Sequence, residues 1–150
     1  MEKQIEHSVD KSSWGPGAWQ NEPDRKEWVD AATGFPCLAH RNEHGGNWCG
    51  YVAVPPGHPA HGKDYDDVDV SVHGGLTYAN QCSGNICHVP ALGEPENVYW
   101  LGFDCHHCND LAPGYASRHP TMPKFGYDVY RTLEYVEAEC ASLAAQLKNL

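Results

Sequence analysis

Two apolar segments separated by a polar turn occupy residues 35–54 (FPCLAHRNEHGGNWCGYVAV). The segments 35–41 and 48–54 each have the length of a strand, and the cluster 42–46 between them is rich in turn-forming residues. Strands joined by a short turn pair as an antiparallel hairpin. We therefore expect this hairpin to form part of an antiparallel sheet.

Further strands are predicted on the C-terminal side of the hairpin. Residues 68–72 (VDVSV) alternate between apolar and polar types, as in a half-buried strand, and apolar character resumes at 76–79 after two glycines. Residues 98–103 (VYWLGF) are the most apolar run and are expected to be the central strand. Together with the hairpin, these segments predict a sheet of about five strands.

Two helices are expected to cover this sheet. Apolar residues at 129, 133, 136, 140, 143, 147 and 150 follow steps of four and three, which place one apolar stripe on a long C-terminal helix. A short N-terminal helix is expected to begin at Glu22-Pro23-Asp24, because proline and acidic residues favour a first helical turn. Its buried side would contain Trp28, Val29 and Ala32.

The chain has 150 residues, which suits one domain. Its first part is polar and is broken at Gly15-Pro16-Gly17. We expect residues 1–20 to form a flexible N-terminal arm and residues 21–150 a single α+β domain. The fold class is thus an antiparallel sheet of about five strands packed against a long C-terminal helix and a short N-terminal helix.

The charge of the chain disfavours several kinds of partner. The formal net charge is −10 and no basic patch is present, which disfavours direct binding of nucleic acid and of membrane surfaces. The N-terminal residues MEKQIEHSVDKSSW contain no apolar core of a secretory signal. We therefore expect a cytoplasmic location, where the seven cysteines would be thiols or metal ligands rather than disulfides.

The strongest candidate site follows the expected central strand, at residues 102–110 (GFDCHHCND). Asp104, His107 and Asp110 are potential metal ligands or acid–base groups. Asp104 and His107 are three residues apart, so one helical turn would place both on one side. The alternative is a polar cap on the strand, in which Asp104 only caps the following turn.

A second candidate site is the segment His73-Gly74-Gly75-Leu76-Thr77. The glycines allow close approach of the backbone to another group, and their amides, with Thr77, are candidates to bind a cofactor or anion. The imidazole of His73 would act as a base or a metal ligand. The alternative is a bulge with an incidental surface histidine.

The cysteines and a long loop leave further alternatives open. Cys82, Cys87, Cys105 and Cys108 have the spacing C-x4-C…C-x2-C, which resembles a structural four-thiolate zinc site. The alternative is that these cysteines are buried as small hydrophobic residues. The polar loop 55–67 is either a lid over a cleft or a solvated loop.

Several of these motifs resemble a family of small uncharacterised proteins of bacteria, prophages and phages. The residues that carry the resemblance are CGYVAVP at 49–55, GHP at 57–59, HGGLTY at 73–78 and WLGFDC at 100–105, with His107 and Asp110. It covers about residues 30–145 and brings no established activity. In that pattern the position of Cys108 is not usually cysteine, which favours His73, Asp104, His107 and Asp110 as the shared polar set.

Two functions are compatible with the sequence. The first is a small metal-dependent hydrolase acting on a small molecule or nucleotide, in which His73, Asp104 and His107 hold zinc and Asp110 assists catalysis. The second is a non-enzymatic acidic phage or prophage protein that binds and inhibits a host protein through charge complementarity. Trp14 and Trp19 would then be exposed anchors for that protein. The oligomeric state is not predicted.

Overall fold

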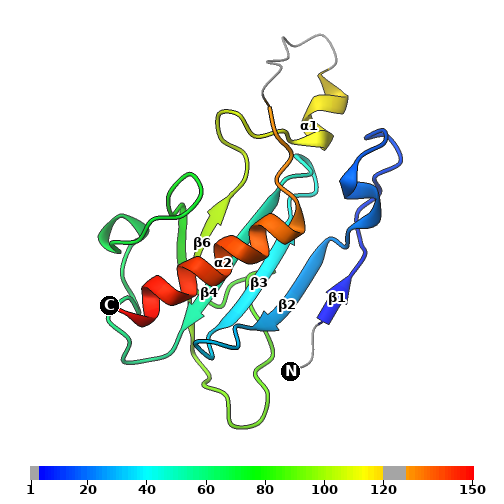
Figure 1. Ribbon diagram of the computed structural model, residues 1–150. Coiled ribbons are helices and arrows are strands. Elements are labelled where there is room, and N and C mark those ends of the chain that lie inside the picture. Colours follow the sequence, from blue (N-terminus) through cyan, green and yellow to red (C-terminus); the bar gives the residue numbers. More distant parts are fainter. Residues whose placement is uncertain (1–3, 120–127) are drawn as a thin grey trace.

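Figure 1 presents a computed structural model of the chain, which describes residues 4–119 and 128–150. The described residues form one antiparallel sheet of six strands with the order β1-β2-β3-β4-β6-β5. The strands are β1 (Gln4–Glu6), β2 (Arg25–Val29), β3 (Pro36–Arg41), β4 (Trp48–Val54), β5 (Tyr78–Gln81) and β6 (Tyr99–Asp104). The expected α+β fold is confirmed.

The C-terminal helix α2 (Leu133–Lys148) packs on one face of the sheet, mainly against β4 (Figure 1). Its inward side includes Leu133, Val136, Cys140, Leu143 and Leu147, which are all buried. These are the central members of the predicted stripe. The outer members lie outside α2, and Val129 and Leu150 are each 47% exposed.

Three shorter helices complete the described structure. They are the 3-10 helices η1 (Ala18–Asn21) and η2 (Tyr65–Asp67) and the α-helix α1 (Pro113–Arg118). In the part of the chain that the structure describes, no helix combines the length and the apolar character needed to cross a membrane.

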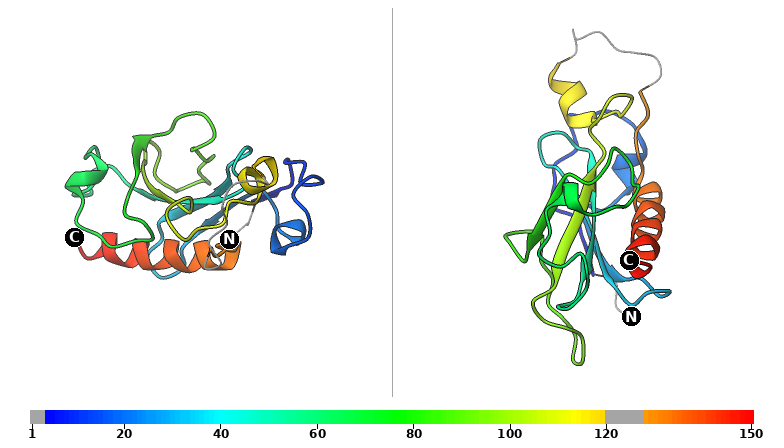
Figure 2. Two further views of the ribbon diagram at one scale, coloured as in Figure 1. Left: turned by 90° about the horizontal axis from the view of Figure 1, so that it is seen from above. Right: turned by 90° about the vertical axis from the view of Figure 1, so that its left-hand side faces the viewer.

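The sheet separates two apolar clusters, because side chains along a strand alternate between its faces. One cluster lies beneath α2 and includes Trp48, Val52 and Phe103. The second, which we call the back-face cluster, contains Leu38, Tyr51, Ala53, Val98 and Trp100. Figure 2 shows α2 on one side of the sheet and the loop that follows β5 on the other.

The predicted hairpin is confirmed as β3 and β4, which pair in the register Cys37 with Val52 and Ala39 with Gly50. The expected central strand corresponds to β6, which has neighbours on both sides but lies next to the edge strand β5. This position brings the end of β6 close to the segment that enters β5.

The predicted N-terminal helix is wrong, because residues 25–29 form strand β2. The strand pairs with β1 on one side and β3 on the other, with Trp28 opposite Cys37. Its backbone groups are thus satisfied by neighbouring strands. Trp28 and Val29 are also residue types that are enriched in strands.

The predicted strand at 68–72 is also wrong. This segment runs beside α2, where the Ser71 amide donates to the Gln146 side chain at 2.7 Å and the Ser71 carbonyl accepts from it at 2.7 Å. A side chain of the helix therefore satisfies backbone groups that a neighbouring strand would otherwise pair. The segment leads directly to His73.

The expected arm makes specific contacts with the sheet over residues 4–21. Lys11 is buried and its Nζ lies 2.8 Å from Asp24 Oδ1, while Trp19 is buried in η1. Strand β1 extends the sheet at its edge. Residues 1–3 lie outside the described residues, and the division into a flexible arm at 1–20 and a domain at 21–150 stays a prediction.

Candidate functional site

His73 is the centre of a hydrogen-bonded cluster between β5, the turn after β6 and α2. Its Nε2 lies 2.8 Å from Asp110 Oδ2, and its Nδ1 lies 2.8 Å from the Tyr135 hydroxyl. Its backbone amide donates to the Glu139 carboxylate at 2.8 Å. Both ring nitrogens of His73 are therefore engaged, one by a carboxylate and one by a phenol.

Asp110 has no exposed side-chain surface, yet all its contacts favour the charged form. Oδ1 accepts from Arg131 Nε at 2.8 Å, and Oδ2 accepts from the His107 amide at 3.0 Å as well as facing His73. Burial raises the pKa of Asp110, but the hydrogen bonds from His73, Arg131 and the His107 amide outweigh it and lower the pKa below its ordinary value. Asp110 is thus a buried, ionised carboxylate at neutral pH.

Asp104 and His107 form the second part of the cluster. His107 Nε2 lies 3.0 Å from Asp104 Oδ1, but the two atoms are not aligned as a hydrogen bond and that nitrogen is buried without a partner. Asp104 also accepts from the Thr77 hydroxyl and from the His106 amide, each at 3.1 Å. The chain after β6 brings Asp104 and His107 together through bends and a turn rather than the helical turn that we expected, and Asp104 is tied to Thr77, just before β5.

The glycines next to His73 allow a close approach, as predicted. A Cβ on Gly74 would lie 2.4 Å from the His107 ring, and the ring centroids of His73 and His107 are 6.2 Å apart. The expected role of Gly74, Gly75 and Thr77 in binding a cofactor or anion stays a prediction. The Gly75 amide donates to the Val72 carbonyl at 2.8 Å.

The four predicted residues His73, Asp104, His107 and Asp110 therefore gather in one place. His73 contacts Asp110 directly and lies beside His107, which in turn contacts Asp104. Two chain segments more than thirty residues apart thus converge, as the sequence led us to expect. Their catalytic roles stay predictions.

The sequence did not single out three further members of the cluster, Arg131, Tyr135 and Glu139. Tyr135 and Glu139 are four residues apart in α2, a spacing that places both on one side of a helix. Burial and the charge of Glu139 raise the pKa of Tyr135, so its hydroxyl stays protonated at neutral pH. The signal in the sequence was an i, i+4 polar pair next to the apolar stripe.

A zinc ion at His73, Asp104 and His107 stays a prediction. Within residues 4–119 and 128–150, no group of three or more His, Cys, Asp or Glu side chains is arranged to hold a metal ion. Because both ring nitrogens of His73 are hydrogen-bonded, a metal would have to replace either Asp110 or Tyr135 as their partner.

The predicted four-thiolate site is wrong. Cys82 and Cys87 are joined by a disulfide, so neither has a thiolate to offer, and the expectation that all cysteines are thiols or ligands is wrong as well. Of the other two, Cys105 is buried and Cys108 is exposed. Burial raises the pKa of the Cys105 thiol well above its ordinary value, which suits a small hydrophobic residue.

Comparison of the chain with protein-family models, with curated proteins and with solved structures finds no match.

Proposed function

We propose that the protein is a small hydrolase whose proton-transfer groups are Tyr135, His73 and Asp110. The observation that supports this proposal best is the pair of 2.8 Å contacts that place the His73 ring between the Tyr135 hydroxyl and the Asp110 carboxylate. A hydroxyl, an imidazole and a buried carboxylate in this order are the parts of a general acid–base relay.

The tautomer of His73 follows from its partners. Ionised Asp110 accepts only, so Nε2 carries the proton and Nδ1 accepts from the protonated Tyr135 hydroxyl. When Tyr135 takes a proton from an attacking water, its own proton moves to Nδ1. The imidazolium that forms is then stabilised by the Asp110 carboxylate, and the hydroxide attacks the substrate.

The residue that meets the substrate in this proposal is Tyr135. It is half-buried, so part of it faces solvent, whereas the Asp110 side chain has no exposed surface. Asp110 therefore acts through His73, as a positioning and charge-stabilising residue. The net charge of −10 favours a small molecule or a single nucleotide over a long polyanion as substrate.

Metal dependence, with zinc as the ion, is the second form of this proposal. Its support is the buried, unpartnered Nε2 of His107, 3.0 Å from a carboxylate oxygen of Asp104. Elemental analysis of protein purified without a metal-affinity tag distinguishes the two forms. Zinc bound in a one-to-one ratio and lost in the variant His107→Ala would support the metal-dependent form.

The experiment is a hydrolysis screen with small esters, phosphate esters and nucleotides, with the variants Tyr135→Phe and Tyr65→Phe. Removing the Tyr135 hydroxyl is expected to lower the rate by about 10²–10⁴-fold, the usual contribution of a general acid–base group. Tyr65 is an exposed residue of η2 and serves as the matched control, so its variant should keep the wild-type rate. A wild-type rate in Tyr135→Phe, or no turnover of any substrate class by the folded protein, would contradict the proposal.

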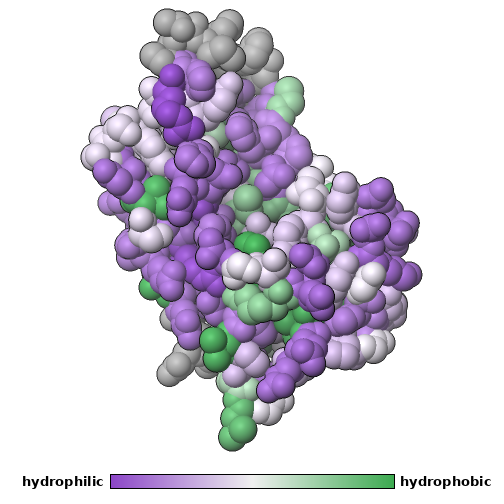
Figure 3. Space-filling model, turned by 180° about the vertical axis from the view of Figure 1, so that it is seen from behind, coloured by the Kyte–Doolittle hydropathy of each residue, from purple (hydrophilic) through white to green (hydrophobic). Residues whose placement is uncertain are grey.

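The second candidate function, an acidic protein that binds and inhibits a host protein, has one favourable observation. The loop after β5 carries the apolar residues Val89 and Leu92, which are 84% and fully exposed. Figure 3 shows this side of the molecule, where hydrophobic spots lie within a mostly hydrophilic surface. The prediction that Trp19 is an exposed anchor is wrong, because Trp19 is buried, and Trp14 is half-buried. A co-purifying basic protein that is released by salt would favour this second function.

The expected cytoplasmic location stays a prediction, which cell fractionation tests.

A further inference from the structure

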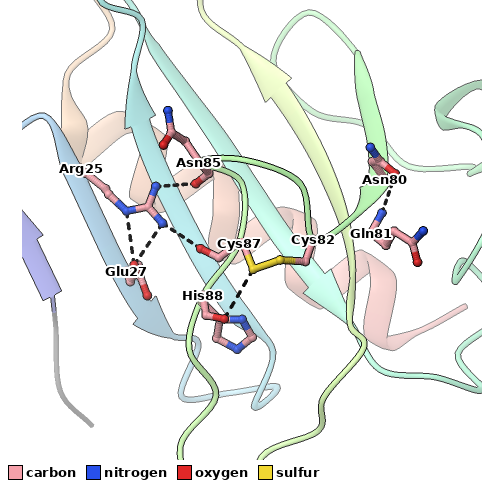
Figure 4. Close-up of a disulfide and its surroundings, with 8 residues drawn as sticks. All are labelled: Arg25, Glu27, Asn80, Gln81, Cys82, Asn85, Cys87 and His88. Carbon is pink, nitrogen blue, oxygen red and sulfur yellow. Dashed lines mark hydrogen bonds and ion pairs between the residues drawn. A yellow bond between two sulfur atoms is a disulfide. The ribbon is translucent and has the colours of Figure 1, made fainter.

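The disulfide between Cys82 and Cys87 lies directly after β5, on the side of the sheet opposite α2 (Figure 4). It closes a tight loop in which Ser83 and Ile86 exchange two backbone hydrogen bonds, of 3.2 and 3.0 Å. The loop begins at one edge of the sheet, since β5 is an edge strand. None of the residues of this loop takes part in the contacts described for the His73 cluster.

This loop crosses the back of the sheet and is held at its far side by β2. Arg25 donates to the carbonyl of Asn85 at 2.5 Å and to the carbonyl of Cys87 at 2.8 Å (Figure 4). A contact with a carboxylate, from Arg25 Nη2 to Glu27 Oε2 at 3.1 Å, orients the same guanidinium. The loop is thus attached to β5 by the chain and to β2 by Arg25.

The loop also covers the back-face cluster. Ile86 packs against the cluster, and the His88 ring meets the buried Trp100 ring edge-on with centroids 5.3 Å apart. Next to it, residues 88–94 and β2 line a cavity of about 530 Å³. The position of residues 82–94 therefore decides both the cover of Trp100 and one wall of this cavity.

The two sulfurs differ in their surroundings. Cys82 is exposed, whereas Cys87 is half-buried and its backbone is bonded to Arg25. An attacking thiolate needs access to the sulfur that it attacks, and the other sulfur then leaves as a thiolate. The difference in exposure therefore favours attack at Cys82, with Cys87 as the leaving thiolate.

We propose that Cys82–Cys87 is an exchangeable disulfide that latches residues 82–94 over the back-face cluster. A thiolate of a dithiol reductant attacks Cys82, the bond between the two sulfurs breaks, and Cys87 leaves as a thiolate that takes a proton. The second thiol of the reductant then displaces Cys82. The protein gains two electrons and two protons, the reductant becomes a disulfide, and a disulfide oxidant reverses the step.

The test applies dithiothreitol to the folded, oxidised full-length protein and follows two readouts. The first is alkylation mapped by mass spectrometry, in which Cys82 and Cys87 become reactive while the buried Cys37, Cys105 and Cys140 stay protected. The second is hydrogen exchange, which should become about tenfold faster in residues 82–94 and stay unchanged in β3 and β4. Brief treatment with a monothiol followed by acid quenching should place the mixed disulfide on Cys82.

Two variants complete the test. The double variant Cys82→Ser/Cys87→Ser should show the faster exchange without reductant, whereas Cys108→Ser, at an exposed free cysteine, should behave as wild type. A disulfide that resists reduction until the protein unfolds overturns the proposal. Cleavage of the disulfide without any change in hydrogen exchange over residues 82–94 would also overturn it. Failure of the bond to form again under a disulfide oxidant would have the same consequence.

Discussion

Asp110 connects the candidate site to stability, because its buried carboxylate is ionised and fully hydrogen-bonded. The variant Asp110→Asn removes the charge and replaces one acceptor oxygen with an NH2 donor, so Arg131 and His73 cannot both keep their acceptor. We expect it to lower the free energy of unfolding at pH 7 by about 1–3 kcal/mol. Urea unfolding measures this, with Asp66→Asn, at an exposed position of η2, as the control that should change little.

The same variant should alter the response to acid. Because the folded-state pKa of Asp110 is lowered, its contribution to stability is complete above the unfolded-state pKa of about 3.9 and is lost as the pH falls through the lower folded-state pKa. Asp110→Asn should therefore lose less stability than wild type below about pH 4. Asp24 also has a lowered pKa and contributes equally in both proteins. An unchanged acid dependence in the variant would show that Asp110 is not held in its charged form.

The individual residues of the site were only partly predictable. His73 and Asp110 stood out because each belongs to a compact polar motif beside glycine or after an apolar strand. Tyr135 and Arg131 did not stand out, because they lie about sixty residues from His73 in the chain. The sequence around them contains no compact polar motif that would mark a site. Tyr135 reaches the site because α2 packs on the sheet, and Arg131 lies just before the start of α2.

Two leucines of the apolar stripe that predicted α2 differ in burial, so their substitution tests how much of the stripe packs against the sheet. Leu143 and Leu150 both belong to the apolar stripe, but Leu143 is fully buried and Leu150 lies beyond the helix with 47% of its surface exposed. Leu143→Ala should cost about 2–5 kcal/mol of unfolding free energy, and Leu150→Ala less than about 0.5 kcal/mol. Urea unfolding of the two variants measures the difference, and equal costs would mean that the stripe packs along its whole length.

Secondary-structure elements were predictable where local signals and long-range pairing agree. The turn at 42–46 brings β3 and β4 together without help from distant residues. Strand β2 fails this condition, because proline and acidic residues before it suggest a helix, whereas its pairing with β1 and β3 is decided by residues elsewhere. Residues 68–72 fail in the opposite sense, since their alternation suits a strand but α2 supplies their partners.

The N-terminal segment, the sheet and α2 are joined by one buried cation, Arg41. Its side chain is 0% exposed and lies over the Trp48 ring, with the guanidinium carbon 4.4 Å from the ring centroid. Its hydrogen-bond acceptors are Glu22, Pro23, Asp24, Gly46 and Tyr130. Glu22 also accepts from the first amide of α2, at Leu133, at 2.7 Å. A single guanidinium thus contacts two carboxylates that hold three parts of the chain together, and Lys11 supplies a second cation to Asp24.

Replacing this cation should therefore loosen the connection between those parts. Arg41→Met keeps apolar volume but leaves Glu22 and Asp24 without their common partner, and we expect a loss of about 3–5 kcal/mol in unfolding free energy. Limited proteolysis should also cut residues 4–21 faster than in wild type, because Glu22 and Asp24 attach that segment to the sheet.

Arg118→Met, at an exposed position of α1, is the matched control and should change stability by less than about 0.5 kcal/mol. Arg41→Lys restores the charge but not the planar fork of donors, so it should recover only part of the loss. Wild-type stability and proteolysis in Arg41→Met would mean that apolar packing alone holds the N-terminal segment in place.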